Sequence, residues 1–259
     1  MKNKAKEIFT KQVFSRPRSL LDVRTHYCPG CHHGIAHRIL AETIDHFDLR
    51  EKTIGVAPVG CAVLMYDYFD VDFVEAPHGR APAVATGVKR AQPDRFVFTY
   101  QGDGDLAAIG MSEIIHAANR GENLTVLFIN NTTYGMTGGQ MAPTTMLGQK
   151  TSTSPYGRDF RNDGYPVRIA EMLASLEGTA FSARVATSTP AQIRKAKEAV
   201  KRAFDTQIRE MGFSIVEILS TCPTNWGMKP HEAQKRVLDE MSGYYPLGVY
   251  KERKQADFA

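Results

Sequence analysis

The amino-acid sequence predicts an α/β fold, in which a doubly wound and mostly parallel β-sheet carries helices on both faces. Short runs rich in β-branched and aromatic residues recur along the 259 residues, and stretches with helical apolar spacing separate most of them. Several of the runs are apolar at every position, which is typical of parallel strands buried between two helix layers.

The expected strands follow one another at regular intervals. Each is a short apolar or β-branched run that ends near Gly, Pro, Asn or Asp: 53–58, 71–76, 95–100, 124–130, 180–187 and 213–219. The expected helices repeat apolar residues every three or four positions: 34–47, 80–91, 106–120, 166–176, 190–210 and 230–241. The clearest is 190–210, where Ala196, Val200 and Phe204 share one face and Lys and Arg residues occupy the other.

The segment 131–165 differs from the rest of the chain. It is rich in Gly, Thr, Pro and Ser and has no sustained period. Loops of this length inside a compact domain are usually functional or disordered. We therefore expect one domain over residues 1–259, with 131–165 as a long loop at the active site.

Composition and charge exclude two classes of partner. The net charge is +4 with the signs interspersed, which does not indicate a nucleic-acid-binding protein. Apolar runs such as 124–129 are too short to cross a bilayer, and the basic stretch 1–11 leads into no apolar signal segment. We expect a cytoplasmic protein with no nucleic-acid or membrane partner.

The stretch "QGDGD" (101–105) directly follows the expected strand 95–100. Glycines on both sides of Asp103 allow a tight turn, and the helix start behind them offers free N–H groups to a phosphate. Asn131 follows the next strand, and neighbouring strands lie roughly 4.8 Å apart, so Asp103 and Asn131 could share one Mg²⁺. A lone Gly-Asp-Gly is usually a structural turn, and the Asn pair after the next strand favours the metal site.

This pattern resembles the diphosphate and Mg²⁺ motif of thiamine diphosphate enzymes, which implies a thiamine diphosphate-binding fold. The resemblance implies that Asp103, the Asn131 side chain and the Thr133 carbonyl ligate Mg²⁺. It also implies that the cofactor pocket is formed by Gly102, Asp103, Gly104, Asp105, Asn131, Tyr134, Gly135, Met136 and Thr137.

The chain contains four cysteines. Cys28 and Cys31 form a close pair in "YCPGCHHG", and Cys61 and Cys222 each follow an expected strand, at the same sheet edge as Asp103. Four thiolates suit either zinc or a [4Fe–4S] cluster, and their spacing does not separate the two. A redox pair at 28 and 31 and simple burial of the other two thiols are the alternatives.

His78 and Arg80 lie in "APHGRAPA", at an expected strand-to-helix turn. Because helix starts bind anions, we expect His78, together with Arg80, to take a catalytic role toward thiamine or substrate. The alternative is an ordinary surface histidine.

Six segments in order, "YCPGCHHG", "GVAPVGCA", "HGRAPAVATG", "QGDGD", "NNTTYGMTGGQMAPTT" and "TCPTNWG", are similar to the thiamine-diphosphate-binding beta subunits of 2-oxoacid:ferredoxin oxidoreductases. The resemblance implies a [4Fe–4S] cluster on Cys28, Cys31, Cys61 and Cys222, with 24–34 as an N-terminal cluster-ligating segment. It implies oxidative decarboxylation of a 2-oxoacid with CoA to acyl-CoA and CO₂, electrons passing from thiamine diphosphate through the cluster to soluble ferredoxin.

Substrate and partners follow from the same resemblance. The expected substrates are a branched-chain 2-oxoacid such as 3-methyl-2-oxobutanoate, or 2-oxoglutarate; Gly138 stands where certain members have a lysine near the substrate carboxylate. No glutamate with a supporting motif activates the thiamine, so we expect an alpha subunit to complete the active site, with a gamma subunit or domain and a ferredoxin-like subunit. The alternatives are a non-oxidative thiamine diphosphate-dependent 2-oxoacid decarboxylase subunit with structural zinc, and a non-catalytic iron–sulfur or zinc protein.

Overall fold

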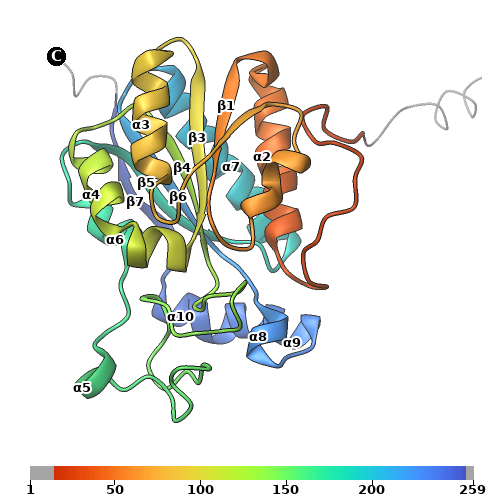
Figure 1. Cartoon of the computed structure of the whole chain (residues 1–259), viewed down its shortest axis with the longest axis vertical. Coiled ribbons are helices and arrows are strands. Elements are labelled where there is room, and N and C mark those ends of the chain that lie inside the picture. Colours follow the sequence, from red (N-terminus) through yellow and green to blue (C-terminus); the bar gives the residue numbers. More distant parts are fainter. Residues whose placement is uncertain (1–14, 255–259) are drawn as a thin grey trace, which may run out of the picture.

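The computed structural model describes residues 15–254, so the basic stretch 1–11 lies outside the described residues. A seven-stranded sheet of order β2-β1-β3-β4-β6-β5-β7 forms its centre (Figure 1). The strands are β1 (Thr53–Ala57), β2 (Asp72–Glu75), β3 (Phe96–Gly102), β4 (Thr125–Asn130), β5 (Thr179–Ala186), β6 (Phe213–Leu219) and β7 (Gly248–Glu252). All pairings are parallel except that of β5 with β7, which confirms the predicted doubly wound, mostly parallel α/β fold.

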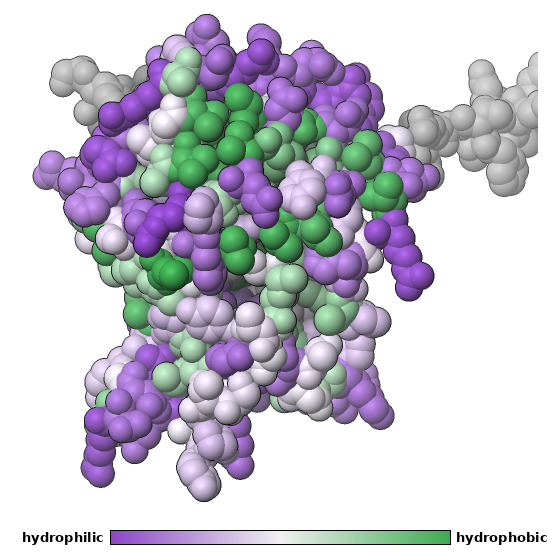
Figure 2. All heavy atoms as spheres, in the orientation of Figure 1, coloured by the Kyte–Doolittle hydropathy of each residue, from purple (hydrophilic) through white to green (hydrophobic). Residues whose placement is uncertain are grey.

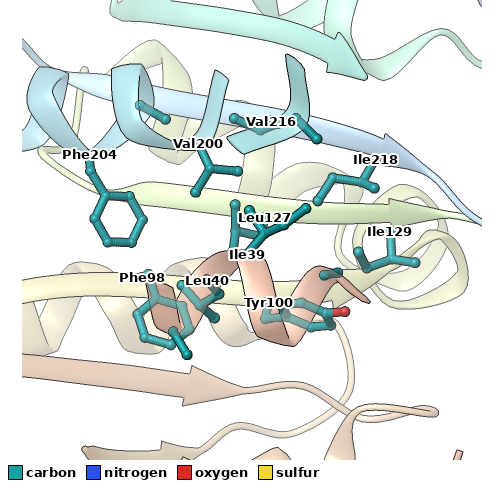
Figure 3. Close-up of a cluster of buried hydrophobic side chains, with 14 of the residues drawn as sticks. Ile39, Leu40, Phe98, Tyr100, Leu127, Ile129, Val200, Phe204, Val216 and Ile218 are labelled. Carbon is teal, nitrogen blue, oxygen red and sulfur yellow. The ribbon is translucent and has the colours of Figure 1, made fainter. Parts of the chain in front are cut away.

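Helices cover both faces of the sheet. The helices α2 (His33–His46) and α7 (Pro190–Ile208) lie on one face, and α3 (Ala81–Ala91), α4 (Met111–Asn119) and α6 (Ile169–Ala174) lie on the other. Figure 3 shows the first layer, where Leu127 of β4 packs with Ile39 of α2 and Val200 of α7. The next residue, Phe128, belongs to the opposite core with Ile114 of α4. Consecutive strand residues therefore enter different cores, which explains why these strands are apolar at every position.

The expected helix 106–120 is broken at Gly110. The chain forms a π-helical turn, η3 (Gly104–Ile109), before α4 begins at Met111. Only glycine fits at the break, because a Cβ on Gly110 would lie 2.6 Å from the carbonyl oxygen of Asp105 and 2.7 Å from that of Gly79. The expected helix 230–241 is likewise divided into α9 (Pro230–Arg236) and the π-helical turn η4 (Val237–Met241), followed by α10 (Ser242–Tyr244).

Arg158 organises the long loop 131–165. Its side chain is buried and donates hydrogen bonds to six backbone carbonyls, those of Ala142, Pro143, Thr145, Asp163, Gly164 and Tyr165. The loop contains one short helix, α5 (Phe160–Asp163). It is therefore an ordered structure built around one guanidinium, although it has almost no regular secondary structure.

The molecular surface is mixed on the face that Figure 2 shows. Hydrophobic side chains gather in the upper half of that view, and the lower third, where the loop 131–165 lies, carries mainly polar or intermediate ones. Within residues 15–254, no helix combines the length and the apolar character needed to cross a membrane.

Candidate active site

Loops from the carboxyl ends of four neighbouring strands, β1, β2, β3 and β4, meet around a cavity of about 130 Å³. All the residues predicted to bind the cofactor line this cavity: Gly102, Asp103, Gly104, Asp105, Asn131, Tyr134, Gly135, Met136 and Thr137, together with Thr133 and His78. The carboxyl edge of a parallel sheet is the usual ligand site of α/β proteins.

Asp103 is the buried acid of this cavity and follows β3 directly. Its Oδ1 accepts the N–H of Gly104 at 2.9 Å, and its Oδ2 accepts the N–H of Thr133 at 3.1 Å and the hydroxyl of Thr144 at 2.7 Å. These donors are neutral and only partly offset burial, which raises the pKa of Asp103 to about 7. A buried carboxylate held by neutral donors fits a cation site, because a nearby positive charge would restore its ionised form.

Asn131 follows β4 directly and is buried, and its Oδ1 accepts the N–H of Thr133 at 3.3 Å. Between them Thr132 has φ +58°, a left-handed conformation that costs a β-branched residue about 1–3 kcal/mol. The carbonyl of Thr132 is held by the side chains of Thr145 at 2.7 Å and Gln149 at 3.0 Å. This reversal brings the backbone N–H of Thr133 to both Asp103 and Asn131, so a carboxylate and an amide oxygen lie at one place, and oxygens of these two types are ligands that suit Mg²⁺.

Asp105 positions the loop after β2. Its Oδ1 accepts hydrogen bonds from Nδ1 of His78 at 2.6 Å and from the N–H of Gly79 at 2.9 Å. Its Oδ2 accepts a hydrogen bond from Nε2 of Gln101 at 2.6 Å. His78 is about one-third exposed and lines the cavity, with Nδ1 taken by Asp105. Its Nε2 is therefore the ring nitrogen available to a ligand.

Arg80 is not brought to the cavity. The residue precedes α3, and its guanidinium pairs with Glu113 of α4 and donates to the carbonyl of Ile109 at 3.3 Å. The expectation that Arg80 acts beside His78 is therefore not supported, because two residues of separation at the start of a helix turn the two side chains in different directions.

The four cysteines line a second cavity of about 340 Å³. Cys28 is exposed, Cys31 and Cys61 are partly buried and Cys222 is buried. This cavity adjoins the first, because Cys61, Asn131, Gly135 and Met136 line both. The structure therefore brings together the Cys28 and Cys31 pair and two single cysteines, Cys61 and Cys222, that are remote in sequence.

The cysteine cavity suits a multi-atom cationic group. Burial, with a smaller effect of neighbouring sulfurs, raises the pKa of Cys31 to about 11 and of Cys61 to about 12, and burial also raises the pKa of Cys222. Several thiolates here would thus need positive charge to form. No set of three or more His, Cys, Asp or Glu residues in 15–254 could hold a single metal ion. Four thiols around one cavity are the ligand set of a [4Fe–4S] cluster.

Two residues that the sequence did not predict donate hydrogen bonds to Asp103 and Cys222. Thr144 donates to Asp103 from the long loop, where no periodicity marks it. Asn225 donates through Nδ2 to Sγ of Cys222 at 3.2 Å and to the carbonyl of Gly135 at 2.7 Å. The only sequence signal for Asn225 is its position three residues after Cys222.

Comparison with known proteins agrees with this geometry. Residues 58–218 match the family described as thiamine pyrophosphate enzyme, C-terminal TPP binding domain. The ketoisovalerate oxidoreductase subunit VorA of Methanothermobacter thermautotrophicus is 48% identical over 94% of this chain and 53% of that protein. The 2-oxoglutarate synthase subunit KorB of Archaeoglobus fulgidus is 38% identical over 90% of this chain and 87% of that protein.

A solved structure supports the same assignment. It is the 2-oxoglutarate:ferredoxin oxidoreductase from Magnetococcus marinus with 2-oxoglutarate, coenzyme A and succinyl-CoA bound, with a TM-score of 0.75 and 26% identity over 95% of this chain and 87% of that chain. Our chain thus spans about half the length of the VorA relative but most of the KorB relative. It belongs to the family of 2-oxoacid:ferredoxin oxidoreductase subunits that carry the thiamine pyrophosphate-binding domain.

Proposed function

We propose that this chain is the beta-type subunit of a 2-oxoacid:ferredoxin oxidoreductase, in which it holds thiamine diphosphate with Mg²⁺ and a [4Fe–4S] cluster. The observation that carries the proposal is the contact of two cavities, one containing the buried Asp103 and the other lined by all four cysteines. The overall reaction converts a 2-oxoacid, CoA and oxidised ferredoxin into acyl-CoA, CO₂ and reduced ferredoxin.

Different residues of the first cavity bind different parts of the cofactor. Asp103, Asn131 and the carbonyl of Thr133 would hold Mg²⁺, and Gly102, where a Cβ would meet nothing within 4 Å, leaves room for the diphosphate to approach the backbone. His78, oriented by Asp105, offers Nε2 to the cofactor or substrate. When bound, thiamine diphosphate supplies the electron sink that decarboxylation of a 2-oxoacid needs.

The second cavity would hold the cluster beside that cofactor. Cys28, Cys31, Cys61 and Cys222 would supply the four thiolates, and Gly135 lines both cavities, so the two binding sites are adjacent. The exposed Cys28 marks the side from which ferredoxin approaches.

A partner alpha subunit completes the active site. The first cavity, at about 130 Å³, is smaller than the roughly 300–1,000 Å³ of most ligand pockets. No glutamate of residues 15–254 lines it to activate the aminopyrimidine ring. Ile109 and Met136, 48% and 55% exposed, leave apolar surface for the partner to cover. A gamma subunit or domain and a ferredoxin-like subunit are the further expected partners, and CoA is the co-substrate.

We propose a branched-chain 2-oxoacid such as 3-methyl-2-oxobutanoate as the substrate. No Lys or Arg from the described part of the chain lines either cavity to bind a second carboxylate, and the VorA relatives are named for ketoisovalerate. The second candidate is 2-oxoglutarate, for which the KorB relatives are named. Ferredoxin reduction by the assembled complex with CoA and each 2-oxoacid separates them, since the preferred substrate has the higher kcat/KM.

Metal content tests the proposal itself. We expect about four irons and four sulfides per chain, with broad absorbance near about 400 nm, in complex purified without oxygen. One zinc and no iron, with aldehyde released from the 2-oxoacid in the absence of CoA and ferredoxin, would instead identify a non-oxidative decarboxylase. Absence of thiamine diphosphate binding in the presence of Mg²⁺ would reject both enzymes.

A further inference from the structure

We propose that Asn225 is a positioning residue that couples the cysteine cavity to the cofactor loop, fixing the reduction potential of the cluster and the position of Gly135 through one amide group. The inference deepens the proposed function and rests on it, because it concerns a cluster on the four cysteines. No direct contact of Asn225 with the substrate is implied.

The short helix α8 (Pro223–Trp226) places Asn225 beside the sulfur. Cys222 immediately precedes this helix, and residues three apart in a helical turn lie on the same side. The Nδ2 atom of Asn225 is 3.2 Å from Sγ of Cys222 and 2.7 Å from the carbonyl oxygen of Gly135. A carboxamide nitrogen carries two hydrogens, so both hydrogen bonds can form at once.

The loop that contains Gly135 lies directly on this arrangement. A Cβ on Gly135 would be 2.9 Å from Sγ of Cys61 and 3.6 Å from Sγ of Cys222. A Cβ on Gly139, where φ is +80°, would be 3.0 Å from Cβ of Asn225. Glycine at both positions therefore lets the backbone approach the sulfurs and Asn225 closely.

The two hydrogen bonds have different consequences. An N–H donated to a cluster thiolate stabilises the reduced state, which carries one more electron, and so raises the reduction potential. The N–H donated to Gly135 fixes a backbone segment that also lines the cofactor cavity. Loss of the Asn225 donor should consequently change the reduction potential of the cluster in the cysteine cavity and the thiamine diphosphate affinity of the cofactor cavity.

The experiment compares Asn225→Ala and Asn225→Asp with Asn119→Ala, an exposed asparagine at the end of α4 that lines neither cavity, in the assembled complex. Iron and sulfide are counted first, then the one-electron potential of the cluster is titrated by EPR, and thiamine diphosphate binding with Mg²⁺ is measured by calorimetry. We expect both Asn225 variants to keep the cluster, to shift its potential to more negative values, and to bind thiamine diphosphate about 2- to 12-fold more weakly, as for loss of one hydrogen bond. The potential shift should be larger in Asn225→Asp, whose carboxylate adds negative charge, and Asn119→Ala should match the wild type.

Unchanged potential and unchanged thiamine diphosphate affinity at full iron content would overturn the inference and leave the proposed function standing. Loss of iron from both Asn225 variants with thiamine diphosphate affinity unchanged would also overturn it, since Asn225 would then support the cysteine alone. Wild-type complex without iron would reject the proposed function instead, before any variant is compared.

Discussion

The phenol ring of Tyr134 occupies the space that a side chain on Gly104 would need. A Cβ at Gly104 would lie 2.2 Å from Cε1 of that ring, and the Tyr134 hydroxyl donates to the Gly104 carbonyl at 3.3 Å. The loop after β4 is therefore in direct contact with the turn after β3, and the absence of a side chain at Gly104 makes that contact possible.

Gly104→Ala should displace Tyr134 and the adjoining loop. Overpacking at a buried position costs about 1–3 kcal/mol, so we expect a lower free energy of unfolding and a thiamine diphosphate affinity reduced more than tenfold. Gly87→Ala is the matched control, because Gly87 also lies in a helix, α3, and its Cβ would meet nothing within 4 Å. Urea denaturation gives the free energy of unfolding of the two variants, and calorimetry gives their thiamine diphosphate affinity. Equal values of both quantities in the two variants would show that the contact between Gly104 and Tyr134 is unimportant.

Asp103→Asn removes the charge from the cation site and nearly conserves its shape. We expect the variant to fold and its Mg²⁺-dependent affinity for thiamine diphosphate to fall at least tenfold, because the amide is a weaker ligand for a hard cation. Calorimetry with and without Mg²⁺ is the measurement. Asp239→Asn, at an exposed position of η4, serves as the control, and wild-type Mg²⁺ dependence in Asp103→Asn would place the cation elsewhere.

Cys222→Ser should impair the cysteine cavity and leave the cofactor cavity nearly unchanged. We expect loss of most of the iron and of ferredoxin reduction, with thiamine diphosphate affinity within about threefold of the wild type, because an oxygen replaces one of four cluster ligands while Asp103 is untouched. Iron analysis and calorimetry on the same sample give both quantities. Thr224→Ser controls for a small change nearby, and full iron content in Cys222→Ser would exclude Cys222 as a ligand.

Arg158→Lys should loosen the long loop. A lysine has one compact ammonium and cannot replace a guanidinium that donates to six carbonyls, so we expect faster proteolytic cleavage within 147–165. We also expect weaker binding of thiamine diphosphate, because Thr144 of this loop donates a hydrogen bond to Asp103. Arg161→Lys, at an exposed position of the same loop, should change neither property. Equal cleavage rates for the two variants would contradict the role assigned to Arg158.

His37 should make the protein sensitive to acid. Burial, reinforced by the nearby His33 and His26, lowers the pKa of His37 well below 6.5. The unfolded chain takes up a proton near pH 6.5 and the folded chain does not, so stability falls as pH drops below about 6.5, by up to about 1.4 kcal/mol per pH unit from this group. We expect His37→Gln to reduce the slope of this dependence in urea unfolding between about pH 6.5 and 5 without abolishing it, because burial also lowers the pKa of His32 to about 4 and of His33 to about 3. His231→Gln, whose side chain is 75% exposed, should leave it unchanged.

The sheet was predictable from sequence because buried parallel strands are apolar at every position. The six expected strands all occur, and their ends match or differ by at most two residues. The edge strand β7 was missed because Gly248–Glu252 is half polar, largely exposed and antiparallel, so it lacks the apolar signal of the others. The break at Gly110 was also missed, because the close packing of Gly110 against the backbone of Gly79, thirty-one positions earlier in the chain, leaves no signal in the local sequence.

The candidate site was predictable where residues directly follow strands. Asp103, Asn131, Cys61 and Cys222 converge because parallel strands end at one edge. Thr144 and Asn225 could not be found in this way, since each reaches its partner from an irregular segment whose path depends on tertiary contacts. Arg80 has the position expected of a site residue but forms an ion pair with Glu113. This pairing depends on the packing of α3 against α4, which the local sequence does not show.

The common sheet edge has an evolutionary consequence. The cysteines and the residues proposed to bind Mg²⁺ lie on separate connections of the sheet. The cysteines follow β1 and β6 or precede α2, and the residues proposed for Mg²⁺ follow β3 and β4. An ancestral chain could therefore gain or lose its four cysteines without altering the strands or the residues proposed to hold the diphosphate. The proposed electron transfer and carbon chemistry would then be separately heritable features of one scaffold, joined mainly at Gly135, where the lack of a side chain lets the backbone approach the sulfur atoms of Cys61 and Cys222.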